Sequence, residues 1–225
     1  MKSGGILLFK GEMEKNDQSL IEEMANSITH GIALLLSIVG IVILVVLAST
    51  RGDIWRVSCF SVYGSTLIIL YTASTLYHSF PRSRLKHILE IIDHSAIYLL
   101  IAGSYTPFAL ISLRGAWGWA LFGTIWALAL VGIVFKMFFV KRFLILSTLT
   151  YLAMGWLALI AVRPIIDNFP LKGIVWLIAG GLFYTLGIIF HFFNKLPFHH
   201  AIWHLFVLGG SICHYFAILF YVLPT

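Results

Sequence analysis

Three histidines and one aspartate, widely separated in the chain, carry the side chains that zinc binds in proteins. They are His78, Asp93, His200 and His204. On a helix, His200 and His204 share one face and lie about 6 Å apart along the axis, so they can chelate one ion. A third imidazole completes the three-ligand site with an open position that is typical of catalytic zinc. We therefore expect Zn²⁺ on His78, His200 and His204, with Asp93 as a fourth ligand or as the partner of a metal-bound water.

Further polar residues lie one helical turn from these candidates. Ser74 precedes His78 by four residues, and Asn26 precedes His30 by four, with Glu23 one turn earlier. This spacing places each pair on one helical face. Ser74, Asn26 and Glu23 could orient ligands or water around the metal. Two alternatives stay open: Ser74 can bond back to its own helix carbonyl, and His30 can replace one of the named ligands.

The other histidines and the two cysteines fit the same site less well. His94 adjoins Asp93 but points about 100° away around the helix. His214 follows His204 by ten residues, about 15 Å along the axis, and is too far away for the same ion. His191 could lie in the outer shell. Cys59 and Cys213 fall inside apolar stretches and read as small apolar residues rather than a disulfide pair.

Membrane helices must position these residues. The chain is 60% hydrophobic and 11% charged, with a mean hydropathy of +0.97, which ordinary soluble domains do not reach. About 20 helical residues cross a hydrocarbon core of roughly 30 Å. Seven stretches of at least 20 residues lack Lys, Arg, Asp and Glu: 24–50, 57–81, 94–113, 115–135, 143–162, 173–194 and 196–225. The sequence therefore predicts seven transmembrane helices.

Two other architectures are excluded. A chain of 225 residues cannot hide seven wholly apolar helices in a soluble core. The stretches also lack the alternation of a membrane β-barrel. We predict an all-α integral membrane protein, a seven-transmembrane helix bundle forming a single domain over residues 1–225. Residues 1–23 are expected to form a cytoplasmic tail and the start of a short interfacial helix, because Ser19 and Glu22 have capping-box spacing and predict a helix start near Leu20.

The orientation follows from Lys and Arg in the loops. One side of the predicted bundle holds ten of these residues and the other holds five. The positive-inside rule then places the N-terminus in the cytoplasm and the C-terminus outside, as expected for a multi-pass protein of a cell membrane. Basic loops beside anionic lipid explain the net charge of +6, so nucleic acid is not needed as a partner.

This topology brings the polar candidates to one end of the bundle. The second helix ends near His78, the third begins near Asp93, and the seventh begins near His200 and His204. All of these points lie on the predicted cytoplasmic side. Ionisable residues within membrane helices are costly and usually functional, so their meeting at one depth favours a metal site.

Several motifs in order resemble the hemolysin III family. They are Glu23-x-x-Asn26-x-x-x-His30, Ser74-x-x-x-His78, the segment from Asp93 to Gly103-Ser104-Tyr105-Thr106-Pro107-Phe108, and His200-x-x-x-His204. That family is grouped with the progestin and adipoQ receptors and the alkaline ceramidases. The resemblance implies zinc on His78, His200 and His204 near the cytoplasmic face, with Asp93 reaching it through water and Ser74 beside it.

The leading functional hypothesis is a zinc-dependent hydrolase of a membrane lipid amide or ester. Zinc would activate a water, Asp93 would accept its proton, and Ser74 would hydrogen-bond the developing oxyanion. One alternative is a receptor or sensor in which zinc ties helices together. Another is a pore-forming cytolysin, although the apolar helices lack the polar stripe that a water-filled channel needs.

Overall fold

The computed structural model is a bundle of membrane-length helices. It describes residues 3–50, 54–80, 83–193 and 195–223, with side chains from residue 20 onward. Within these residues, seven helices are long and apolar enough to cross a membrane. They span Leu20–Thr50, Ile54–Ser79, Arg84–Leu113, Gly115–Phe139, Leu144–Asn168, Leu171–Phe192 and His199–Val222. The predicted seven-helix membrane protein is confirmed.

The helices form a closed ring around a central space. Their bounds are α1 (Ser3–Thr50), α2 (Ile54–Ser79), α3 (Arg84–Pro107), η1 (Phe108–Leu113), α4 (Gly115–Phe139), α5 (Leu144–Gly155), η2 (Leu157–Ala161), α6 (Val162–Asn168), α7 (Leu171–Phe192), α8 (His199–Ala217) and η3 (Ile218–Val222). Neighbours in the chain pack on one another, and α1 also packs on α8. The first and last helices therefore lie side by side.

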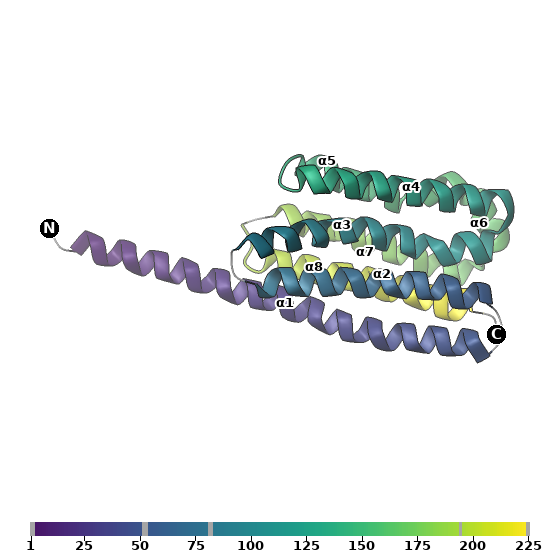
Figure 1. Cartoon of the computed structure of the whole chain (residues 1–225), viewed down its shortest axis with the longest axis horizontal. Helices are drawn as coiled ribbons and strands as arrows, with labels where there is room; N and C mark the ends of the chain where they lie inside the picture. The colour runs from purple at the N-terminus through teal and green to yellow at the C-terminus, as the bar shows by residue number, and fades with distance from the viewer. Residues whose placement is uncertain (1–2, 51–53, 81–82, 194, 224–225) are drawn as a thin grey trace.

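The first helix differs from the expectation. It begins at Ser3 and runs without a break to Thr50, so the predicted start near Leu20 is wrong. In Figure 1 its N-terminal part projects beyond the ends of the other helices. The capping-box spacing of Ser19 and Glu22 does not mark a helix start here. Residues 3–18 contain no Pro, so the helix can extend through them toward the N-terminus.

Two membrane spans change helix type along their length. The α-helical part of the third span ends at Pro107, and the span continues as the π-helix η1 to Leu113. Pro107 lacks a backbone N–H, and membrane helices tolerate such a residue by local π adjustment. The fifth span passes from α5 through the 3-10 helix η2 into α6. Both changes occur away from the ends that hold the predicted site residues.

Glycines allow close packing between α7 and α8. A Cβ at Gly180 would overlap the side chain of His214, and a Cβ at Gly210 would lie 2.7 Å from the ring of Tyr184. Small residues at these positions let membrane helices approach closely. Cys59 and Cys213 are free and buried, which agrees with their reading as apolar residues.

Lys136 does not lie in a loop, as the count of basic loop residues assumed. It is in the last turns of α4 and its side chain is only 1% exposed. Without Lys136, the side predicted to be cytoplasmic has nine basic residues and the other side has five. The same side still carries the excess of positive charge. Several residues used in that count lie outside the described side chains: Lys2, Lys10, Lys15, Arg51 and Arg82.

Candidate metal centre

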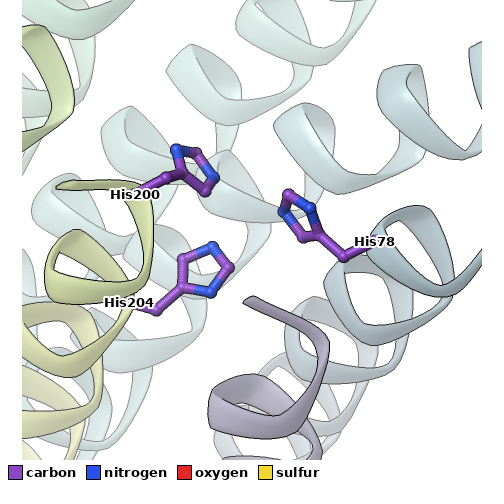
Figure 2. A group of neighbouring side chains, drawn as sticks. All are labelled: His78, His200 and His204. Carbon is purple, nitrogen blue, oxygen red and sulfur yellow. The ribbon is translucent and has the colours of Figure 1, made fainter. Parts of the chain in front are cut away.

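Three histidines from two helices converge near one end of the bundle. His78 comes from the end of α2, and His200 and His204 from the first turns of α8. One ligand nitrogen from each residue lies within 4.8 Å of the others. The ring centroids are 5.1 Å apart for His78 with either partner and 4.6 Å apart for His200 and His204. Figure 2 shows the three rings facing a common space.

The carboxylate of Glu23 fixes one nitrogen of His78. Oε2 of Glu23 lies 2.6 Å from Nδ1 of His78, and Oε1 accepts a hydrogen bond from Nζ of Lys86 at 3.0 Å. Nε2 of His78 is buried and has no hydrogen-bond partner among the described residues. A carboxylate that binds one ring nitrogen and leaves the other free is the usual arrangement around a zinc-binding histidine.

The backbone of α1 orients His204 in a similar way. Nδ1 of His204 lies 3.2 Å from the carbonyl oxygen of Asn26 and 3.2 Å from the hydroxyl of Thr29. The Thr29 hydroxyl itself donates to the same carbonyl at 2.9 Å, so Nδ1–H of His204 is the donor in both contacts. Nε2 of His204 is then the unprotonated nitrogen and can bind a metal.

These contacts show that the residues fit a metal ion. His78 and His204 are buried, and each has Nδ1 occupied by an acceptor. An orphaned buried nitrogen costs free energy unless a ligand satisfies it. Three imidazoles with nitrogens this close to one another form a donor set that suits zinc and other borderline divalent metals. The cluster can therefore hold a metal with three protein ligands.

His30 lies against this cluster but is not one of its three ligands. Its ring stacks on that of His204, with centroids 3.5 Å apart and an interplanar angle of 12°. Both of its ring nitrogens are buried and lack hydrogen-bond partners in the part of the chain that is described. His30 thus packs directly behind one ligand and presents polar atoms that the protein does not satisfy.

Asp93 and Ser74 lie beside the cluster and are buried. Asp93 is near enough to His78 and Ser74 to interact with both side chains, but it is not part of the three-ligand group. The Ser74 hydroxyl has no hydrogen-bond partner within 3.5 Å among the described residues. The back-bond to its own helix is therefore absent. Both residues line a cavity, together with His200 and His204.

This cavity has a volume of about 280 Å³ and runs between the helices of the ring. One end of it is lined by Asp93, His200 and His204 of the candidate metal centre. Away from that end its walls are mostly aliphatic and aromatic, and they include Leu100, Phe108, Ile165, Phe169 and Leu177. A largely apolar space with polar groups at one end suits an acyl chain with a polar head.

The structure differs from the sequence reasoning in how the outer contacts are made. Asn26 reaches His204 through its backbone carbonyl, while its side-chain oxygen is buried without a described partner. Sequence reasoning missed Thr29 and Lys86. Thr29 lies three residues after Asn26, the spacing of neighbours on one face, and that spacing could have revealed it. Lys86 gave no such signal, because only the folded structure brings its Nζ within 3.0 Å of Oε1 of Glu23.

Comparison with known proteins identifies a family and several similar proteins. A family model described as "Haemolysin-III related" matches residues 18–215. The chain is 52% identical over 214 residues to "Hemolysin-3" of Bacillus cereus, which covers 95% of this chain and 98% of that protein. It is 54% identical over 200 residues to "Hemolysin-3 homolog" of Bacillus subtilis, covering 89% of this chain and 94% of that protein.

A more distant human relative extends the comparison. The chain is 31% identical over 207 residues to the human "Monocyte to macrophage differentiation factor", covering 89% of this chain and 84% of that protein. This match connects the chain to the progestin and adipoQ receptors. No solved structure gives a significant match.

The comparisons confirm the resemblance that the motifs suggested. The bacterial relatives, together with the seven spans, identify a multi-pass protein of the bacterial cell membrane. The matched segment contains Glu23, His78, Asp93 and His204. Because the family model covers nearly the whole chain and the bacterial relatives match over nearly their full length, the chain belongs to the haemolysin III-related family.

Proposed function

We propose that this protein is a zinc-dependent membrane hydrolase that cleaves an amide or ester bond of a lipid. The support is the combination of a three-histidine cluster, an adjacent buried carboxyl group and an apolar cavity that ends at both. Three protein ligands leave a position open, as in catalytic zinc sites, whereas structural sites are usually closed by four. The open position beside the cavity is the observation that carries the proposal.

In this proposal His78, His200 and His204 hold the zinc ion. When bound, zinc supplies Lewis acidity and makes a water molecule acidic enough to react near neutral pH. Glu23 and the Asn26 carbonyl hold the imidazoles in the tautomer that leaves Nε2 free. Ligand geometry is thus set by α1, although the ligands themselves come from α2 and α8.

Asp93 and Ser74 act on the substrate and the attacking water. A carboxylate oxygen of Asp93 accepts a proton as the oxygen of water bonds to the carbonyl carbon. The same carboxyl group returns the proton to the leaving nitrogen or oxygen as the bond to that carbon breaks. The unpaired Ser74 hydroxyl donates a hydrogen bond to the carbonyl oxygen, where negative charge develops.

The experiment combines metal content with product release. Protein purified in a neutral detergent without chelator is analysed for zinc and incubated with ceramides, acyl amides and acyl esters. We expect about one zinc per chain and release of fatty acid that Asp93→Asn abolishes. Protein that retains zinc but releases no fatty acid from any of these substrates would count against a hydrolase.

A receptor or sensor role for the zinc is the second candidate. The three histidines join α2 to α8, so an ion there would cross-link two helices that are far apart in the chain. In that case Asp93→Asn would lower thermal stability without affecting any turnover. The name hemolysin, which the Bacillus relatives carry, also refers to lysis. Dye release from liposomes that survives loss of all three histidines would indicate a pore instead.

The orientation is also a proposal. Apart from Lys136, nine Lys and Arg residues are assigned to the end of the bundle that carries the candidate metal centre, and five are assigned to the other end. We therefore propose that the N-terminus and the metal centre face the cytoplasm, with the C-terminus outside.

A further inference from the structure

A lysine is buried in the cavity at the same end as the metal centre. Lys136 lies near the end of α4, is 1% exposed, and lines the cavity. By contrast, the side chain of Lys141, two residues beyond the end of that helix at Phe139, is 68% exposed. A lysine near a helix end in a membrane usually extends its ammonium group to the headgroup region. Lys136 instead points inward.

The ammonium group of Lys136 has no ion-pair partner within 4.0 Å among the described residues. The carboxylate that interacts with it electrostatically is Glu90, which is engaged elsewhere. Glu90 pairs with Lys141 at 3.5 Å and with His87 at 3.3 Å. Nζ of Lys136 lies over the face of the Tyr151 ring, 5.9 Å from the ring centroid. A buried cation left in this state is costly unless a ligand neutralises it.

Two histidines on neighbouring helices add donors to the same region. His94 of α3 and His191 of α7 both line the cavity, and Nδ1 of each is buried without a partner among the described residues. Both interact electrostatically with Lys136. The helices α3, α4 and α7 therefore each bring one nitrogen group to the same part of the cavity. Among the described residues, none of these groups has a hydrogen-bond or ion-pair partner.

This cluster is next to the metal centre but separate from its ligands. The ring of His191 is 5.9 Å from that of His200, and His191 also packs on Trp203 at 5.2 Å. Lys136, His94 and His191 are not members of the group of metal-binding histidines. The cavity is also lined by Leu144, Thr148 and Leu152 of α5.

We propose that Lys136, His94 and His191 form a binding site for the acidic headgroup, phosphate or carboxylate, of an amphiphile whose chain occupies the apolar cavity. The Lys136 ammonium supplies the charge, and the two imidazoles supply N–H donors. The proposal needs the cavity and the unpaired nitrogens only, and it does not depend on hydrolysis. It predicts selectivity for acidic over neutral amphiphiles at this site.

The test measures binding of three probes to protein purified in a neutral detergent. The probes are oleoyl lysophosphatidic acid, oleate and neutral monooleoylglycerol, followed by fluorescence of Trp156 and Trp203, which line the cavity. We expect at least one acidic probe to bind about tenfold or more tightly than the neutral one. The phosphate and carboxylate probes distinguish a phospholipid headgroup from a free fatty acid.

The variants are Lys136→Met and, on the exposed loop nearby, Lys141→Met as the matched control. Lys136→Met should lose the preference for acidic probes and keep binding of monooleoylglycerol, while Lys141→Met should behave as wild type. Lys136→Gln replaces it if Lys136→Met does not fold. Equal binding of acidic and neutral probes by the wild type, or an unchanged preference in the Lys136 variants, would overturn the proposal.

A further variant separates this site from the metal. Zinc could itself attract a carboxylate or phosphate, so the probes are also measured with His204→Ala. A preference that persists in His204→Ala and disappears in the Lys136 variants assigns recognition of the acidic group to Lys136. The opposite pattern assigns it to the metal centre and rejects the proposal.

Discussion

Oε2 of Glu23 on α1 lies 2.6 Å from Nδ1 of His78 on α2, and the two residues are 55 positions apart in the chain. The same carboxylate binds Lys86 of α3 through its other oxygen at 3.0 Å. One side chain therefore connects three helices and fixes the orientation of a ring in the three-histidine cluster. The site depends on α1 as much as on the helices that carry its ligands.

Loss of the Glu23 charge should weaken metal binding without removing a ligand. We expect Glu23→Gln to lower zinc affinity by about 10- to 100-fold, as is usual when the carboxylate behind a metal-binding histidine is removed. Competition with a fluorescent zinc chelator measures this affinity. Glu90→Gln is the control, because Glu90 pairs with His87 and Lys141 rather than with a ligand. Equal affinity in both variants would mean that Glu23 does not support the site.

Loss of a ligand should remove the stabilising effect of the metal. A ligand at 1,000 times its dissociation constant stabilises the folded state by about 4 kcal/mol. We expect a chelator to lower the thermal unfolding midpoint of wild type but to leave that of His204→Ala unchanged. His87→Ala should respond as wild type, because the His87 side chain is 51% exposed and outside the cluster. A chelator effect that persists in His204→Ala would place the metal elsewhere.

Asp93 should be needed for turnover but not for metal retention. General base catalysis contributes about 10² to 10⁴ to the rate, so Asp93→Asn should reduce fatty acid release by at least that lower factor. Zinc content and the unfolding midpoint should stay close to those of wild type, because Asp93 is outside the ligand group. Loss of zinc together with activity would show instead that Asp93 is a ligand.

Packing between α3 and α4 can be tested at a glycine. A Cβ at Gly132 would overlap the ring of Tyr98, which is buried and held by a 2.8 Å hydrogen bond to Thr150. We expect Gly132→Ala to destabilise the fold by about 1–3 kcal/mol, the usual cost of overpacking. Gly123→Ala on the same helix is the control, because nothing lies within 4 Å of its Cβ. Equal unfolding midpoints in a neutral detergent would contradict this packing.

The proposed orientation predicts the location of fused reporters. Alkaline phosphatase folds into its active form outside the cytoplasm, and green fluorescent protein exported in unfolded form does not become fluorescent. We expect a C-terminal phosphatase fusion to be active and a C-terminal fluorescent fusion to be dark, since the C-terminus is proposed to lie outside. The reverse pattern would invert the whole bundle and move the metal centre to the outer face.

Most of the fold was predictable because the bilayer imposes length and apolarity on each span. The end at which His78, His200 and His204 meet followed from topology alone, since alternate loops lie on the same side. The start of α1 could not be predicted, because a local capping pattern does not begin a new helix where the residues before it are already helical. The inward position of Lys136 was also missed, since a lysine that follows an apolar stretch is indistinguishable from a loop residue until its helix packs.

For Asn26, the sequence could indicate that the residue supports the site, but not which of its atoms makes the contact. Spacing on a helix placed Asn26 beside His30 and identified it as a residue that could orient the ligands, yet its backbone oxygen rather than its side chain meets His204. Which atom is used depends on how α8 packs on α1. Those two helices are far apart in the chain, and no local pattern encodes their distance.

The pairing of the first and last helices has a consequence for biosynthesis. His204 reaches across to the carbonyl of Asn26, 178 residues earlier in the chain. During translation the early helices leave the ribosome first, so His78 and Glu23 are in place while α8 has yet to be made. If the cluster holds the proposed ion, a chain interrupted before α8 carries one of its three ligands and cannot retain it. Metal loading would then mark the chains whose synthesis and insertion are complete.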